Sequence, residues 1–202
     1  MSDSTPVILS ARRTPIGRFM GGLSRVPAPE LGAIAISSAL SDSNMAPNSI
    51  DEVFMGCVLQ AGIGQNPARQ AALKAGIPDT VTAVTLNKVC GSGLEAVMQA
   101  CRAIKCGDIE TAVAGGMENM DLAPHFAHVR GGVKYGPATM QDHMAFDGLT
   151  CAFEQWPMGN AAEWIANEHD VSREEQDRFS AQSHNRAEAA WAEGFFTDEI
   201  VT

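Results

Sequence analysis

The sequence predicts an α/β fold, with a mixed sheet built from βαβ units and helices that cover it. Short apolar stretches of strand length alternate with segments in which apolar residues recur at helical spacing. Such alternation is typical of parallel strands joined by helical crossovers. With 45% hydrophobic and 19% charged residues among 202, the chain has the composition of a globular protein and enough length to bury a core.

The first fifty residues predict one strand and one helix. Residues 7–10 (VILS) form an apolar run that we interpret as a short buried strand. Proline is favoured at the first position of a helix, so we expect a helix to begin at Pro29. The residues expected on one face of this helix are Leu31, Ile34, Ala35, Ser38 and Ala39.

The next segment predicts a strand, a helix and a second strand. The two strands are DEVFMGCVL at 51–59 and VTAVTL at 81–86, which are rich in apolar and β-branched residues. Between them, Asn66 is expected to cap a helix whose first residue is Pro67. Gly76 is expected to end this helix, because glycine readily adopts the left-handed conformation that follows a helix.

A third helix is expected directly after Cys90, and a further strand (TAVAGG) at residues 111–116. The helix carries apolar residues that recur at helical spacing and would share one face. These residues are Leu94, Val97, Met98, Cys101 and Ile104.

The composition changes after Met120, and we expect a domain boundary there. Residues 1–120 would form a core domain, and residues 121–202 would form part of an inserted loop domain. Residues 121–160 mix Gly, Pro, His and Met with little periodicity, as in a long loop or subdomain.

The last segment predicts a long polar helix. Ser172 and Glu175 have the spacing of a capping box, and Gly194 is expected to end the helix that they begin. Its faces are mostly polar, so only Phe179 and Trp191 are expected to anchor it by packing.

The formal net charge of −10 gives no basic footprint for nucleic acid or for an anionic membrane surface. No apolar run approaches the length of a membrane span. The five cysteines include no CxxC pair and no spacing typical of a metal site. The first residues, MSDSTP, lack the features of a signal peptide or a presequence. We therefore expect reduced thiols, a cytoplasmic location, and no nucleic-acid, membrane or metal partner.

The segment most informative about function is NKVCGSGL at residues 87–94, where a strand ends and two glycines open a helix. Cys90 is expected near the amino end of that helix, where unpaired N–H groups and the helix dipole favour a thiolate. A thiolate is the form that attacks thioesters, and the adjacent N–H groups could stabilise an oxyanion. On spacing alone, a small buried hydrophobic cysteine is the commoner alternative.

Longer motifs favour the nucleophile. NKVCGSGLEAV resembles the nucleophile motif of thiolases, and GGMENMDLAPH at 115–125 resembles their second N-terminal signature. The stretches VILSARRTPIGRFMGGL, DGLTCAF at 147–153 and SREEQD at 172–177 also resemble thiolases, in the order in which thiolases have them. The resemblance covers nearly the whole chain, and it is closer to biosynthetic acetoacetyl-CoA thiolases than to the long-chain degradative branch.

This resemblance implies a thiolase-like fold and reversible acyl transfer between two acyl-CoA molecules by a covalent ping-pong route. The expected reaction condenses two acetyl-CoA to acetoacetyl-CoA and CoA, or reverses this by thiolysis. Cys90 matches the acyl-accepting cysteine, Leu149 a residue lining the pantetheine tunnel, and Met158 a residue near the acyl pocket. Loop packing is the alternative for the last two. Residues 121–145 match the loop that mediates tetramer assembly, so a homotetramer is expected. No cofactor is implied, because the coenzyme A thioester is the substrate.

Two departures from the thiolase pattern bear on these expectations. Thiolases usually have a histidine before the methionine–glycine pair, whereas Pro157 stands there in this chain, which puts the acyl-chain specificity in question. Thiolases also have a C-terminal half with a histidine in a GHP motif and a second cysteine in a CxG motif, and neither motif occurs here. Catalysis is therefore expected to need a C-terminal thiolase half that is not in this chain.

Two other functions stay open. The chain is alternatively a truncated, non-catalytic thiolase half that acts as a scaffold or an acyl-CoA binder. A ketoacyl synthase is a weaker alternative, because the cysteine context of those enzymes differs from NKVCGSGL. The basic residues that could bind the coenzyme A phosphates are scattered, so we expect phosphate contacts outside this chain; these residues are Arg12, Arg13, Arg18 and Arg25.

Overall fold

The computed structural model describes residues 5–201. Residues 1–4 lie outside the described residues. They belong to the stretch MSDSTP, from which we expect no signal peptide or presequence. The central sheet is parallel, with strand order β2–β1–β3 and Glu52 in register with Thr82 on one side and Ala112 on the other. Its strands are β1 (Glu52–Gly56), β2 (Thr82–Leu86) and β3 (Ala112–Gly116).

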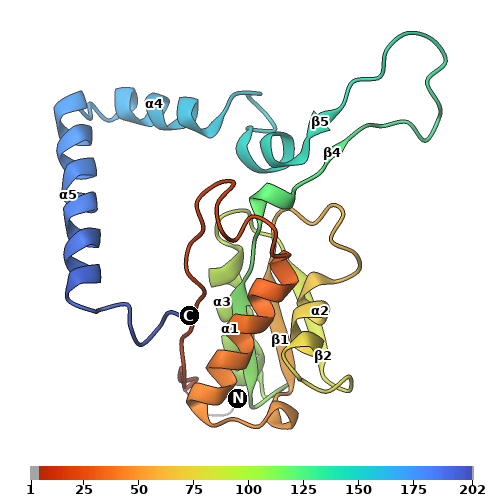
Figure 1. The fold of residues 1–202 in the computed structure, drawn as a ribbon, viewed down its shortest axis with the longest axis vertical. Coiled ribbons are helices and arrows are strands. Elements are labelled where there is room, and N and C mark those ends of the chain that lie inside the picture. Colours follow the sequence, from red (N-terminus) through yellow and green to blue (C-terminus); the bar gives the residue numbers. More distant parts are fainter. Residues whose placement is uncertain (1–4, 202) are drawn as a thin grey trace.

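Helices cover both faces of this sheet (Figure 1). Helices α1 and α2 contact each other and lie on one face, and α3 lies on the other. Parallel strands covered by helices confirm the predicted α/β class. The described sheet is parallel rather than mixed, because the antiparallel pairing of two further strands lies outside it. The helices are α1 (Ala28–Ser43), α2 (Pro67–Lys74) and α3 (Ser92–Cys106), with a 3₁₀ turn η1 (Pro47–Ser49) before β1.

Strand β1 is buried on both faces, because its successive side chains point to opposite sides of the sheet and helices cover both sides. Val53 and Met55 pack with α1 and α2, whereas Phe54 packs with Ala96 and Ala100 of α3. A strand in this position has a continuous apolar sequence, which explains why its location was predictable.

The start and end of α2 confirm the sequence prediction. The side chain of Asn66 accepts a hydrogen bond from the Arg69 N–H at 3.1 Å, and Pro67 is the first helical residue. Gly76 follows the helix with φ +86°, a left-handed conformation that glycine adopts without steric cost.

The predicted faces of α1 and α3 were wrong. Ile34 and Met98 are exposed, and the side chain of Leu94 is 69% exposed. Only small residues of α3 are buried against the sheet, because they allow the closest approach between backbones, whereas α1 buries small residues together with Ile36 and Leu40. The buried residues of α1 are Ala28, Pro29, Gly32, Ala33, Ile36 and Leu40, and those of α3 are Ser92, Ala96 and Ala100.

The prediction of a buried strand at residues 7–10 was also wrong. No strand among residues 5–201 pairs with this segment, and Ile8 is 79% exposed. The chain first pairs at Arg13, whose N–H donates to the Glu199 carbonyl and whose carbonyl accepts from the Val201 N–H, both at 2.9 Å. An apolar run forms a strand only where a neighbour supplies hydrogen-bond partners.

After β3 the chain leaves the core and forms an arm, which we define as residues 123–198. Figure 1 shows its helices α4 and α5 standing away from the sheet. Helix α4 was not predicted, and the division into domains at residue 120 stays a prediction. The elements from the end of the core onward are η2 (Met120–Leu122), β4 (His125–Phe126), β5 (Gln141–Asp142), the π-helical segment η3 (Met144–Leu149), α4 (Met158–Glu168) and α5 (Arg173–Ala192).

Helix α5 begins with the predicted capping box. The Ser172 hydroxyl accepts from the Glu175 N–H at 3.2 Å, and the Glu175 carboxylate accepts from the Ser172 N–H at 3.0 Å. The prediction that Phe179 and Trp191 anchor this helix by packing was wrong, because both side chains are exposed; Trp191 lies edge to face with its near neighbour Phe196. Across residues 5–201, none of the helices combines the length and apolar character that a membrane crossing requires.

Candidate active site

Cys90 lies between the end of β2 and the start of α3, and its side chain is exposed. Gly91 is the N-cap of α3 and Ser92 its first residue. The parallel strands end on this side of the sheet, which is also the side from which η2 and the arm extend (Figure 1). The thiol therefore stands at the surface beside a helix amino terminus, rather than in the core.

Three glycines allow the start of α3 to lie directly against the ends of two strands. A Cβ on Gly56, at the end of β1, would lie 2.6 Å from Ser92 Cβ. A Cβ on Gly116, at the end of β3, would lie 3.2 Å from Gly93 Cα. Because backbone meets backbone at these contacts, the sheet fixes where the helix begins.

The turn that leads to Cys90 contains a strained residue. Val89 has φ +48°, a left-handed conformation that β-branched residues rarely adopt and that costs about 1–3 kcal/mol. Hydrogen bonds within the turn oppose this cost. The Val89 N–H donates to Asn87 Oδ1 at 2.8 Å, the Lys88 N–H donates to Ser92 Oγ at 2.9 Å, and the Gly91 N–H donates to the Lys88 carbonyl at 3.1 Å.

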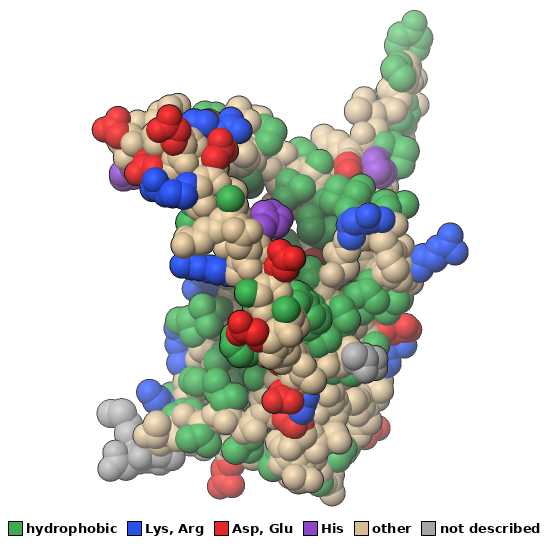
Figure 2. Space-filling view, turned by 60° about the vertical axis from the view of Figure 1, so that its left-hand side comes forward, with side chains coloured by type: hydrophobic (Ala, Val, Ile, Leu, Met, Phe, Trp, Pro, Cys, Tyr) green, Lys and Arg blue, Asp and Glu red, His purple; other side chains and the backbone are tan. Residues whose placement is uncertain are grey.

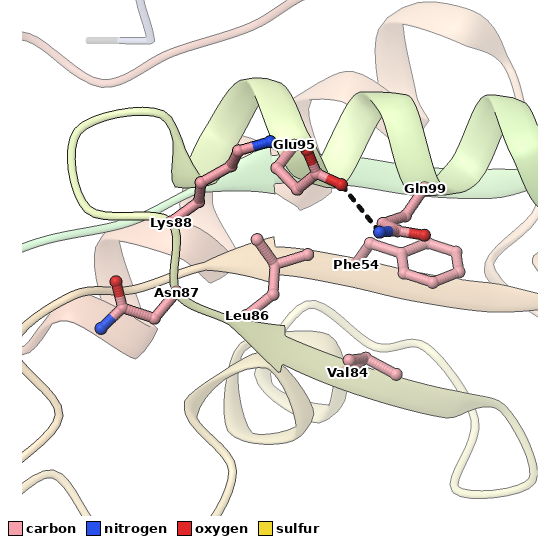
Figure 3. Close-up of a pocket in the computed structure, with 7 residues that line it drawn as sticks. All are labelled: Phe54, Val84, Leu86, Asn87, Lys88, Glu95 and Gln99. Carbon is pink, nitrogen blue, oxygen red and sulfur yellow. Dashed lines mark hydrogen bonds and ion pairs between the residues drawn. The ribbon is translucent and has the colours of Figure 1, made fainter.

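An open pocket of about 420 Å³ lies beside this turn, between β2 and α3 (Figure 3). Its charged residues are Lys88 and Glu95, and the Glu95 carboxylate accepts from Lys88 Nζ at 2.6 Å, Gln99 Nε2 at 2.7 Å and Arg102 Nη1 at 2.8 Å. The hydrogen bonds from Lys88, and then from Arg102, lower the pKa of Glu95 to about 2. The pocket is lined by Phe54, Val84, Leu86, Asn87, Lys88, Glu95 and Gln99.

The environment of Cys57 differs from that of Cys90. Cys57 is 1% exposed at the end of β1, and its Sγ lies 3.7 Å from a Glu118 carboxylate oxygen. Burial, and then the negative charge of Glu118, raise the pKa of the Cys57 thiol to about 12. Cys57 is thus a neutral core residue at ordinary pH, as predicted for a cysteine outside the nucleophile motif.

Two polar residues of the GGMENM stretch hold loops at the same end of the sheet, and sequence reasoning missed their roles. The Glu118 carboxylate accepts from the Val58 and Leu59 N–H groups at 2.8 and 3.2 Å. The Asn119 side-chain amide donates to backbone carbonyls of the loop before α1, at 2.7 Å for Val26. Their position just after a strand end was the available signal, because loops from neighbouring parallel strands meet there.

Leu149 and Met158 lie on either side of a closed loop. Thr150 and Pro157 form an antiparallel bridge, Leu149 ends η3 just before it, and Met158 begins α4 just after it. Both side chains are exposed. The structure therefore brings these two residues together, while the pocket beside the Cys90 turn is lined by neither of them.

His143 is the histidine that the structure buries, with 7% of its surface exposed. Its Nε2 accepts from the Ala61 N–H at 3.3 Å, so Nδ1 carries the proton that faces Asp147 Oδ2 at 2.5 Å. Both ring nitrogens are engaged in holding loops together, which is the loop-packing role predicted for the histidines.

Two of the arginines considered for phosphate binding are committed to internal contacts. Arg12 forms an ion pair with Asp42, and Arg13 pairs with Glu199 at 2.8 Å and lies over the Phe196 ring at 5.2 Å. The hydrogen bond from Arg12 also lowers the pKa of Asp42. Within residues 5–201, no group of three or more His, Cys, Asp or Glu side chains is arranged to hold a metal ion.

A family model for the N-terminal domain of thiolase matches residues 6–202 of the chain. The chain belongs to the thiolase family. Known thiolase relatives resemble it over nearly its full length. Acetyl-CoA acetyltransferase of Cupriavidus necator is 53% identical over 196 residues, which cover 96% of this chain and 50% of that protein. Acetyl-CoA acetyltransferase of Rhizobium meliloti is 51% identical over 201 residues, covering 100% and 51%.

A mammalian relative is similar to the same degree. The cytosolic acetyl-CoA acetyltransferase of Rattus norvegicus is 50% identical over 195 residues, covering 96% of this chain and 49% of the rat protein. This thiolase N-terminal domain thus spans about half the length of the curated relatives it matches.

Proposed function

We propose that this thiolase N-terminal domain is the acyl-accepting part of an acetyl-CoA acetyltransferase, with Cys90 as its nucleophile. The observation that carries the proposal is the exposed thiol of Cys90 at the amino end of α3, at the carboxyl edge of a parallel sheet. Relatives named acetyl-CoA acetyltransferase support acetyl-CoA as the substrate.

In the first half-reaction, the Cys90 thiolate attacks the carbonyl carbon of acetyl-CoA. The electron pair of the carbonyl moves to oxygen, and we assign the stabilisation of that charge to N–H groups in the first turn of α3 that have no intrahelical carbonyl partner. Collapse of the intermediate breaks the bond to the coenzyme A sulfur. Coenzyme A leaves as a thiolate, and an acetyl group stays on Cys90.

In the second half-reaction, a base removes the α-proton of a second acetyl-CoA. The resulting carbanion attacks the acetyl carbonyl on Cys90, which releases acetoacetyl-CoA and restores the thiolate; the reverse sequence is thiolysis. A positioned base contributes about 10²–10⁴-fold in rate. By family resemblance, a histidine and a second cysteine of a C-terminal thiolase half transfer these protons, and the route uses no cofactor.

Substrate binding is assigned to Leu149 and Met158 on the two sides of the closed loop. Exposed apolar side chains suit the pantetheine and acyl portions of the substrate, which are uncharged. The proline before Met158 is compatible with an acyl pocket that differs from the usual thiolase arrangement.

We extend the proposal to assembly and location. A homotetramer built through residues 121–145 is supported by the protruding loop between β4 and β5, along which Figure 2 shows hydrophobic side chains. A cytoplasmic location is supported by the rat relative that is named cytosolic. The exposed apolar residues of the loop are Val129, Val133, Tyr135 and Met140.

Acetylation of the protein by acetyl-CoA tests this function. We expect peptide mapping by mass spectrometry to find one acetyl group, on Cys90, that is lost in Cys90→Ala and kept in the matched control Cys101→Ala. Label spread evenly over the five cysteines would contradict a selective nucleophile. Binding of acetyl-CoA without any acetylation would instead favour the alternative of a non-catalytic acyl-CoA binder.

A further inference from the structure

We propose that Glu95 is a positioning residue for Cys90, acting through Lys88. The turn before α3 presents the Cys90 thiol, and the ion pair between Lys88 and Glu95 fastens this turn to α3. The inference rests on the proposed role of Cys90, and it concerns residues that take no part in the chemistry themselves.

The contacts of Glu95 join the turn to the helix. Lys88 lies two residues before Cys90, and its Nζ donates a hydrogen bond to Glu95 Oε2, seven residues later in the chain, at 2.6 Å. The other carboxylate oxygen, Oε1, accepts from Gln99 at 2.7 Å and from Arg102 at 2.8 Å. The carboxylate is thus held from both sides, with Lys88 on one and Gln99 on the other (Figure 3). Its side chain is only 12% exposed.

The turn needs such a tether because its backbone is strained. The left-handed φ of Val89 is unfavourable for a β-branched residue, so the turn tends to relax towards negative φ. Rotation at this position would swing the next residue, Cys90, away from the start of α3. The bond to the Asn87 side chain stays within the turn, and the bond to Ser92 reaches only the first residue of the helix. The Lys88 side chain, by contrast, connects the turn to Glu95, one turn further along the helix.

The same contacts contribute little to global stability. Lys88 is 61% exposed, and exposed ion pairs stabilise proteins only weakly. The matched contact between Arg102 and Glu95 has a similar length and exposure but lies further along the helix, away from the turn. A purely structural ion pair would therefore give the same result when either cation is removed, and a positioning pair would not.

The test compares Lys88→Met, Glu95→Gln and their double variant with Arg102→Met as control, in the full chain. Two readouts are used: the rate of Cys90 acetylation by acetyl-CoA, and amide hydrogen exchange of the peptide that spans the turn. We expect each of the first two variants to slow acetylation about tenfold, since misplacing a reacting group by about 1 Å costs up to 10²-fold. The double variant should be no slower than either, because one tether is lost in all three.

The conservative variant Lys88→Arg keeps the charge, so its acetylation rate and its hydrogen exchange should stay within about twofold of those of the original chain. The same is expected of the control Arg102→Met. Faster exchange of the turn amides in Lys88→Met and Glu95→Gln, but not in Arg102→Met, supports the tether. If exchange changes in this way but neither the variants nor the original chain is acetylated, the proposed function fails and the tether stands. Unchanged exchange in Glu95→Gln, or equal slowing of acetylation in Arg102→Met, would overturn the positioning role.

Discussion

In the core, from α1 to β3, buried apolar side chains of β1 and three helices pack with partly buried ones of β2 and β3, whereas α4 and α5 in the arm bury none of theirs. The arm is held instead by local hydrogen bonds, such as the capping box of α5, by the bond from the Ala61 N–H to His143, and by contacts at its two ends. The space-filling view shows acidic and basic side chains over much of the arm (Figure 2). The difference implies that core substitutions act through packing and arm substitutions through helix caps.

The largest contrast is expected between two methionines. Met55 in β1 is buried, so Met55→Ala should lower the free energy of unfolding by about 2–5 kcal/mol through lost contacts and a cavity. Met158→Ala in the arm should change it by less than about 0.5 kcal/mol, because that side chain is exposed. Urea denaturation measures both, and equal effects would mean that the arm is as tightly packed as the core.

A second contrast compares two glycines. Gly56→Ala should cost about 1–3 kcal/mol, because the new Cβ would meet the backbone of Ser92 and push the start of α3 away from β1. Gly159→Ala in α4 meets nothing within 4 Å and should stabilise that helix by about 0.5–1 kcal/mol. Thermal unfolding measures the changes. A Gly56→Ala variant with unchanged stability and unchanged Cys90 acetylation would contradict the rigid placement of α3.

Removing the cap of α5 should act on the arm alone. Ser172→Ala is expected to destabilise this helix by about 1 kcal/mol, because it leaves the Glu175 N–H without its acceptor. Hydrogen exchange should rise in the first turn of α5 and stay unchanged in the core. The control is Ser180→Ala, in mid-helix, whose hydroxyl bonds only to the Gln176 carbonyl within the helix. Raised exchange in core amides would show that the two regions unfold together.

The smallest effect concerns the pH dependence of the ion pairs at Glu95. The pKa of Glu95 falls from 4.5 to about 2 on folding, so its stabilising contribution is present above pH 4.5 and is lost as the pH falls towards 2. The stability difference between the original chain and Glu95→Gln should be constant above pH 4.5 and shrink below it. Denaturation across this range measures the difference, and a constant value would show that Glu95 titrates normally.

Local signals carried most of what the sequence predicted. The cap at Asn66, the capping box at Ser172 and the helix start after Cys90 each depend on residues within a few positions, and all three are present. Predictions failed where the outcome depends on distant neighbours. Leu94 has helical spacing with other apolar residues, but the close approach of α3 to the glycines of the sheet turns small residues inward instead.

The candidate site follows the same rule. The position of Cys90 before a helix was predictable from the glycines that follow it. The side chains that hold the neighbouring loops in place were not predictable. Glu118 binds an amide 60 positions earlier in the chain, and His143 binds the Ala61 N–H across 82 positions. Neither pairing has a spacing that sequence periodicity reveals, because the partners meet only after the sheet has assembled.

The bridge between Arg13 and Ile200 makes the arm a loop that is fastened to the core at both ends, at η2 and at this bridge (Figure 1). Closure of a chain between two fixed points becomes only slightly less favourable as the chain lengthens, by about 0.6 kcal/mol for each doubling. The core should therefore tolerate arms of very different length and sequence without altering its own topology. An arm of this kind lets surface recognition diversify while the scaffold that holds Cys90 stays the same.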